Sequence, residues 1–107
     1  MLKIINATWG YHGYWVDVAH ILTAAIAANP AGNLIIIVNP ATLTPNGDPL
    51  YWWVKELNVI YEFNGIKHQI MIQEKCGNPP ITLTITEGIA TTTPNGRGLL
   101  TISGLIP

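Results

Sequence analysis

The stretch that decides the fold runs from Glu56 to Gln73 and reads ELNVIYEFNGIKHQIMIQ. Apolar and polar residues alternate on both sides of Asn64-Gly65, which is the period of a strand with one buried face. The dipeptide Asn-Gly favours a two-residue type I′ turn, because both central residues of that turn need a positive φ. The stretch therefore predicts a β-hairpin that turns at Asn64-Gly65.

The two-residue turn also fixes which residues of the hairpin lie opposite each other. Each such pair contributes roughly 0.2–1 kcal/mol, and a shift by one residue would place Val59 and Ile70 on different faces. The expected pairs on the apolar face are Phe63 with Ile66, Tyr61 with His68, Val59 with Ile70 and Leu57 with Ile72, and those on the opposite face are Glu62 with Lys67, Ile60 with Gln69, Asn58 with Met71 and Glu56 with Gln73.

Four further segments are expected to form strands. Lys3 to Ala7 is short and rich in β-branched residues, and the continuous apolar run Leu34 to Val38 predicts a central strand buried on both faces. Ile81 to Thr86 carries threonine at every outer position, which predicts a half-buried strand. Leu99 to Ile106 is expected to be the last strand, and the run that begins at Leu50 is expected to lead into the hairpin.

A helix is expected from Asp17 to Ala28, because apolar residues recur there at helical spacing, with a strand followed by one turn as the alternative. Asp17 is the expected N-cap and Asn29-Pro30 the expected stop. With many strands, at most one short helix and turns of Gly, Pro and Asn, the chain is predicted to be a single domain over residues 1–107. Its expected fold is a mainly β, antiparallel β-sandwich of jelly-roll-like type.

Charged residues are scarce, at 10% of the 107 residues against about 25% in typical globular chains. The formal net charge is −1, so no positive surface is expected that would neutralise several phosphates or attract an anionic membrane. No apolar run reaches the about 18 residues of a membrane span, and the first residues lack the pattern of a signal peptide. We therefore expect no nucleic-acid partner, no membrane insertion and a cytoplasmic location for the chain as encoded, with secretion by another route left open.

Patterns for catalysis and metal binding are weak. Cys76 is the single cysteine, and His12, Asp17 and His20 lie close in sequence without a fourth ligand beside them. Ser103 is the single serine and has no Gly-x-Ser-x-Gly setting, and no two acidic residues are spaced as a glycosidase pair. The sequence thus predicts a protein that is not an enzyme and that holds no cofactor and no metal.

The aromatic residues give the clearest sign of a ligand. Four of them crowd the stretch Trp9 to Trp15, where two glycines predict a loop, and three more follow one another from Tyr51 to Trp53. Exposed Trp and Tyr rings stack on sugar C–H groups or anchor protein interfaces, whereas buried ones fill the core. The predicted ligand-binding residues are Trp9, Tyr11, His12, Trp15 and Asp48.

Seven short motifs lie between residues 9 and 85: Trp9-Gly10, Trp15-Val16-Asp17-Val18, Asn33-Leu34-Ile35-Ile36, Gly47-Asp48-Pro49, Lys55-Glu56-Leu57-Asn58-Val59-Ile60-Tyr61, Gly65 and His68-Gln69-Ile70-Met71-Ile72. Together they resemble a known family, the domain of unknown function at the C-terminus of the DnaJ-type co-chaperone subfamily C member eleven and of related small microbial and fungal proteins. The family often has Tyr-Gly and Asp-Val-Thr where this chain has Trp9-Gly10 and Asp17-Val18-Ala19. The resemblance implies a β-rich accessory module and supplies no catalytic residues, and no His-Pro-Asp of a J domain is present.

From these observations we expect a non-enzymatic binding module, with glycans as the leading ligand class and lectin-like recognition through loops rich in Trp and Tyr. The alternative is a self-associating structural or protein-interaction module that forms homo-oligomers. A surface with few charges gives little repulsion between copies, which favours that alternative.

Overall fold

The computed structural model of the chain describes residues 1–44, 54–73, 80–93 and 99–103, the last four of these as backbone. The strands are β1 (Leu2–Tyr11), β2 (Tyr14–Asp17), β3 (Leu34–Val38), β4 (Glu56–Phe63), β5 (Ile66–Gln73), β6 (Ile81–Thr86), β7 (Ile89–Thr93) and β8 (Leu99–Ser103), and the helices are α1 (Ala19–Ala28) and the single turn α2 (Pro40–Leu43).

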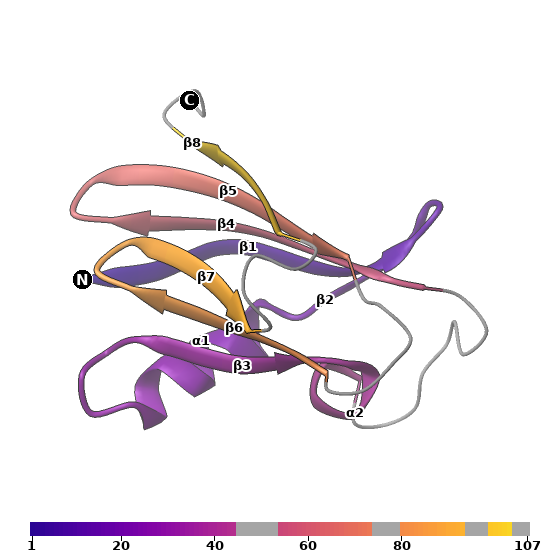
Figure 1. The fold of residues 1–107 in the computed structure, drawn as a ribbon, viewed down its shortest axis with the longest axis horizontal. Coiled ribbons are helices and arrows are strands. Elements are labelled where there is room, and N and C mark those ends of the chain that lie inside the picture. The colour runs from indigo at the N-terminus through magenta and orange to yellow at the C-terminus, as the bar shows by residue number, and fades with distance from the viewer. Residues whose placement is uncertain (45–53, 74–79, 94–98, 104–107) are drawn as a thin grey trace.

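The strands form two antiparallel sheets that lie one above the other (Figure 1). The larger sheet has the order β2-β1-β4-β5-β8, and the smaller one has the order β3-β6-β7. Helix α1 lies between β2 and β3 in the sequence and packs beside β1 and β3. The predicted fold class, a mainly β antiparallel sandwich with few helices, is confirmed.

The hairpin from Glu56 to Gln73 forms as predicted, with β4 and β5 joined by Asn64-Gly65. All eight expected residue pairs are found, from Glu56 opposite Gln73 to Phe63 opposite Ile66. Asn64 and Gly65 have φ values of 52° and 82°, as a type I′ turn requires. This hairpin lies in the middle of the larger sheet and positions the strands on either side of it.

One hydrophobic core fills the space between the two sheets. Alternate residues of β3, β4 and β6 are buried, which is the pattern of strands with one face inward and one outward. The apolar residues at helical spacing also join this core: Val18 and Leu22 are buried, and Ile21, Ala25 and Ile26 are half-buried against them. The buried apolar residues are Leu2, Ala7, Trp9, Val18, Leu22, Leu34, Ile36, Val38, Leu43, Leu57, Val59, Tyr61, Ile70, Ile72, Ile81, Leu83 and Ile85.

The prediction that Leu34 to Val38 is a central strand buried on both faces is wrong. Strand β3 pairs with β6 alone among the described strands, which makes it an edge of the smaller sheet. Its side chains alternate, so Ile35 is 55% exposed and Ile37 is 43% exposed. A continuous apolar run does not by itself distinguish a central strand from an edge strand whose outer face is also apolar.

The helix and the hairpins differ from the prediction in detail. Helix α1 begins at Ala19 and has Val18 as its N-cap, while the Asp17 carboxylate accepts a hydrogen bond from the Ala19 N–H at 2.9 Å. It ends at Ala28 with Asn29 as its C-cap, at the stop expected for Asn29-Pro30. Strands β2 and β7 were not predicted, and β1 extends to Tyr11, well beyond the expected end at Ala7. Residues 45–53, including Asp48 and the aromatic run from Tyr51, and residues 104–107 of the last expected strand lie outside the described residues.

A buried hydrogen bond ties the two sheets together at one end of the sandwich. The Tyr61 hydroxyl of β4 donates to the Gly88 carbonyl in the β6–β7 turn at 2.8 Å, and the Tyr61 ring stacks on His68 with centroids 5.0 Å apart. Gly88 has a φ of 79°, and a Cβ atom there would lie 2.9 Å from the Phe63 ring. The turn is therefore seated directly on side chains of the larger sheet.

Candidate functional site

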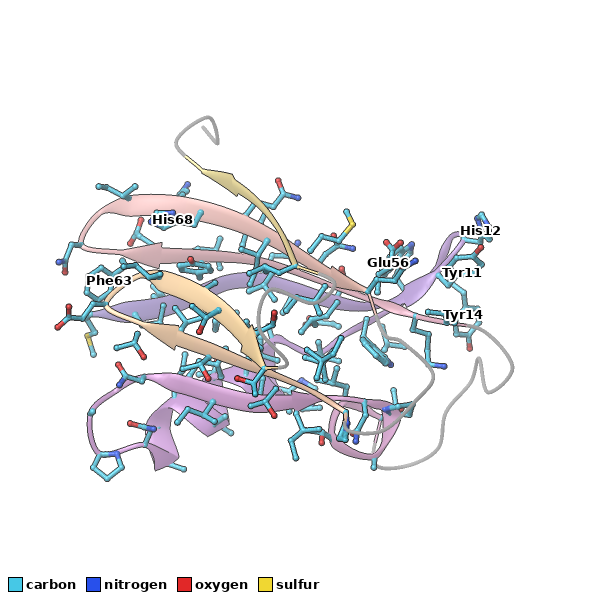
Figure 2. All side chains as sticks on the ribbon, viewed as in Figure 1. Tyr11, His12, Tyr14, Glu56, Phe63 and His68 are labelled. Carbon is cyan, nitrogen blue, oxygen red and sulfur yellow. The ribbon has the colours of Figure 1, made fainter. Side chains whose placement is uncertain are left out.

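The aromatic stretch near the N-terminus is a hairpin and not the loop that its glycines predict. Strands β1 and β2 pair from Thr8 opposite Asp17 to Tyr11 opposite Tyr14. The turn between them is His12-Gly13, with φ values of 45° and 77°. The hairpin reaches out from one end of the sandwich, and Tyr11, His12 and Tyr14 stand at its tip (Figures 1 and 2).

The backbone of β2 approaches Gly10 of β1 closely and so fixes the hairpin. A Cβ atom at this position would collide with the Tyr14 carbonyl oxygen and lie 2.9 Å from the Trp15 Cα. The backbone of β2 thus crosses the place where a side chain would stand. Gly10 is needed here for space, which explains one of the two glycines that suggest a loop.

Several rings at the hairpin are accessible to a ligand. Tyr14 is 52% exposed and Trp15 is 39% exposed. Tyr11 is half-buried and meets the exposed His12 ring edge to face, with centroids 3.9 Å apart and planes at 67°. Trp15, Tyr11 and His12, three of the predicted ligand-binding residues, therefore lie on one projecting element.

The expectation that Trp9 offers its ring to a ligand is wrong. Its side chain is 1% exposed, because Trp9 pairs with Val16 and Leu57 on the inner face of the sheet. No hydrogen-bond partner of the Trp9 Nε1 is found within the described part of the chain. Trp9 is a core residue that supports the hairpin from below. Asp48, the remaining predicted residue, lies outside the described residues.

Register places polar residues beside Trp15 on the outer face of the larger sheet. Gly10 of β1 lies opposite both Trp15 of β2 and Glu56 of β4. In the next outward-facing row, Thr8 lies opposite both Asp17 and Asn58. Directly opposed residues of antiparallel strands project to the same face, so these side chains share one surface. We call the set Thr8, Trp15, Asp17, Glu56 and Asn58 the hairpin platform.

The dimensions of the hairpin platform follow from sheet geometry. Trp15 and Glu56 stand on strands that flank β1, so their Cα atoms are about 10 Å apart, and successive rows are about 7 Å apart. Glu56 is visible at the base of the hairpin in Figure 2. An indole, a hydroxyl, an amide and two carboxylates within this area can stack on a ring and bond its hydroxyl groups.

Thr8, Glu56 and Asn58 were absent from the predicted site. The sequence did place Glu56 and Asn58 on the outer face of their hairpin, but it gave no sign that β1 pairs with β4. That pairing joins segments about 50 residues apart in the chain, and it alone brings these side chains next to Trp15. The concentration of aromatic residues in the sequence indicated the ligand-binding segment. The pairing of β1 with β4 is also needed to identify the polar residues beside it.

The described residues form neither a cluster of metal ligands nor a membrane-spanning helix. Within residues 1–44, 54–73, 80–93 and 99–103, no group of three or more His, Cys, Asp or Glu is arranged to hold a metal ion. None of the helices in these same ranges is long and apolar enough to cross a membrane.

Comparisons with known proteins return no match: no family model, no curated protein and no solved structure is similar to the chain. The resemblance to the co-chaperone domain therefore stays a prediction.

Proposed function

We propose that the protein is a non-enzymatic module that binds neutral glycans on the hairpin platform. The observation that carries the proposal is the exposed Trp15 indole on the same sheet face as Asp17, Glu56 and Asn58. A sugar ring would stack on the indole, and its hydroxyl groups would donate to the carboxylates and bond the Asn58 amide.

Rigid support makes this surface suitable for a weakly held ligand. The hairpin base is fixed by the backbone contact at Gly10 and by the buried Trp9 on the opposite face. The Asp17 carboxylate is oriented by the bond that it accepts from Ala19. Because these groups are already ordered, binding costs less conformational entropy than it would on a free loop.

The charges of the platform favour neutral over acidic sugars. Asp17 and Glu56 carry its formal charges, and both are negative. A uronic or sialic acid would bring a third carboxylate within about 10 Å of them, where repulsion is incompletely screened at physiological salt. We therefore expect neutral hexoses and N-acetylhexosamines to bind in preference to acidic sugars.

The test is binding of the purified chain to a glycan array, followed by titration of the best neutral glycan. Trp15→Ala should weaken binding at least tenfold, which corresponds to about 1.4 kcal/mol for the lost ring. Asn58→Ala should weaken it by less. Ile89→Ala removes an exposed apolar side chain from the other sheet and serves as the matched control, with unchanged affinity. An array without bound glycans, or a Trp15→Ala variant that binds like the wild type, contradicts the proposal.

A second candidate function, self-association, is favoured by the outer face of the smaller sheet. All eight outward-facing residues there are isoleucine or threonine, and none is charged. We call this surface the Ile/Thr face, and its residues are Ile35, Ile37, Thr82, Thr84, Thr86, Ile89, Thr91 and Thr93. The occupant that we propose is the same face of a second copy, because an uncharged surface of isoleucine and threonine meets its own copy without charge repulsion.

The size of the Ile/Thr face limits how strong this association is. Three strands of about five residues span about 14 Å by 17 Å, or about 240 Å² per copy. A stable dimer buries about 800 Å² per partner, so the contact is expected to be weak and to depend on concentration.

Sedimentation velocity over a hundredfold range of concentration tests this second candidate. The wild type should shift from monomer towards dimer as concentration rises, and Ile37→Lys should stay monomeric because its ammonium would be buried against a second copy. Lys is tolerated at this exposed edge position in the monomer. Ile5→Lys, an exposed isoleucine of the larger sheet, is the control that should associate like the wild type. A wild type that remains monomeric throughout excludes this function for the face.

A further inference from the structure

A pocket of about 360 Å³ lies at the end of the sandwich opposite the β1–β2 hairpin. The start of β1, the α1–β3 connection, the end of β4 and the β6–β7 turn meet there (Figure 1). Phe63, which lines the pocket, is labelled at this end in Figure 2. The volume is at the lower end of the range for small-molecule sites, which suits a ligand the size of one sugar ring.

The lining combines an apolar wall with a polar rim. Leu2 is buried and Phe63 half-buried, whereas Asn33, Thr86 and Glu87 are half-buried or exposed. Within the described part of the chain, the side chains of Asn33, Thr86 and Glu87 form no hydrogen bond. Their amide, hydroxyl and carboxylate groups are therefore available to a ligand in the pocket.

Both loops that carry the polar rim are held in place by hydrogen bonds. On one side, the Asn29 carboxamide oxygen accepts from the N–H groups of Ala31 at 2.9 Å and Asn33 at 3.4 Å. On the other side, the β6–β7 turn is fixed by the bond from the Tyr61 hydroxyl to the Gly88 carbonyl. The backbone that carries the rim side chains is thus ordered before a ligand arrives, which lowers the cost of binding.

The charge at the pocket favours a neutral over an acidic ligand. Glu87 is the single ionisable side chain among the described residues that line the pocket, and its carboxylate would repel an anion. A molecule with several hydroxyl groups on one side and C–H groups on the other would satisfy the rim and pack against Phe63 and Leu2.

We propose that this pocket is a second binding site, independent of the hairpin platform, for a single neutral sugar residue or a polyol of that size. The geometry places acceptor and donor groups of Asn33, Thr86 and Glu87 around an opening whose wall is Phe63. A chain with a site at each end of the sandwich can hold two sugar residues at once, which raises its avidity for branched or clustered glycans.

Titration of the uniformly ¹⁵N-labelled full chain with glucose, galactose, mannose and N-acetylglucosamine tests the proposal. With at least one of the four sugars we expect saturable shifts of the backbone amides of residues 31–33 and 86–88. These shifts should persist in Trp15→Ala, which removes the ring of the other site. Asn33→Ala should weaken the binding about tenfold through loss of hydrogen bonds.

A blocking variant and a matched control complete the design. Ala31 lines the pocket and is exposed, so Ala31→Trp should fill the space without disturbing the core and should abolish the shifts. Ala24→Trp places the same side chain at an exposed position of α1 and should leave them unchanged. The proposal is overturned if none of the four sugars shifts these amides saturably, or if the shifts survive Ala31→Trp. Shifts confined to residues 8, 15, 17, 56 and 58 would overturn it while supporting the hairpin platform.

Discussion

Gly10→Val is expected to separate β2 from β1 while the rest of the sandwich stays folded. A side chain at this position collides with the Tyr14 carbonyl and crowds the Trp15 Cα, and both neighbours are backbone that cannot rotate away. Overpacking of a closely packed site costs about 1–3 kcal/mol, and contact with backbone places this variant at or above the upper end. The amides of Tyr14 to Asp17 should lose hydrogen-exchange protection, and urea unfolding should begin at lower denaturant.

Gly13→Ala is the control that separates lack of space from backbone conformation. Gly13 has a φ of 77°, but nothing lies within 4 Å of the place that its Cβ would take. The free energy of unfolding of Gly13→Ala should therefore fall by about 1 kcal/mol, because of the strained φ alone, and β2 should stay paired with β1. The close approach of the β2 backbone to Gly10 would be contradicted if Gly10→Val were as stable as Gly13→Ala and the β2 amides kept their hydrogen-exchange protection. Gly10→Val should also lose glycan binding, because Trp15 moves with β2, whereas Gly13→Ala should keep it.

Among the described residues, three hairpins have the same kind of turn, and one of the three is predictable from the sequence. Asn64-Gly65, His12-Gly13 and Glu87-Gly88 all have two successive positive φ values. Asn-Gly is a strong sequence signal for a type I′ hairpin turn, whereas His-Gly and Glu-Gly are not among the dipeptides that signal it. The second and third turns are held by their strands and by tertiary contacts such as the Tyr61 bond to Gly88, which local sequence does not reveal.

The same limit explains the errors in the candidate site. The alternation of faces along a strand separates Trp9 from Trp15 only when both strands and the turn between them are known. Because the stretch was predicted to be a loop, this separation could not be predicted. Once the turn is placed at His12-Gly13, Trp15 pairs with Gly10 and Trp9 pairs with Val16, which separates the exposed ring from the buried one. Glu56 and Asn58 had been assigned correctly to an outer face. Their role depended on the β1–β4 pairing, which no local pattern encodes.

Tyr61→Phe is expected to lower the free energy of unfolding by about 1–3 kcal/mol at neutral pH. The substitution keeps the ring that stacks on His68 but removes the hydroxyl, so the buried Gly88 carbonyl loses its donor. Because this bond joins β4 to the β6–β7 turn, the loss should also weaken protection of the β7 amides. Urea denaturation and hydrogen exchange of the two proteins measure both effects. Tyr14→Phe, at an exposed tyrosine of the hairpin tip, should leave the free energy of unfolding within about 0.5 kcal/mol of the wild type.

The contribution of Tyr61 should also depend on pH in a defined direction. Burial raises the pKa of the Tyr61 phenol above its ordinary value of 10.0, because the phenolate is disfavoured away from water. A group whose pKa is higher in the folded state stabilises the fold fully below its unfolded pKa and loses that effect as pH rises through the folded value. The free energy of unfolding of the wild type should therefore fall from about pH 10 upward. In Tyr61→Phe the part of this fall that comes from ionisation of Tyr61 should be absent. The difference between the two proteins should shrink as pH rises from 9 to 11. A difference that stays constant over that range would mean that the Tyr61 hydroxyl is neither buried nor bonded as described.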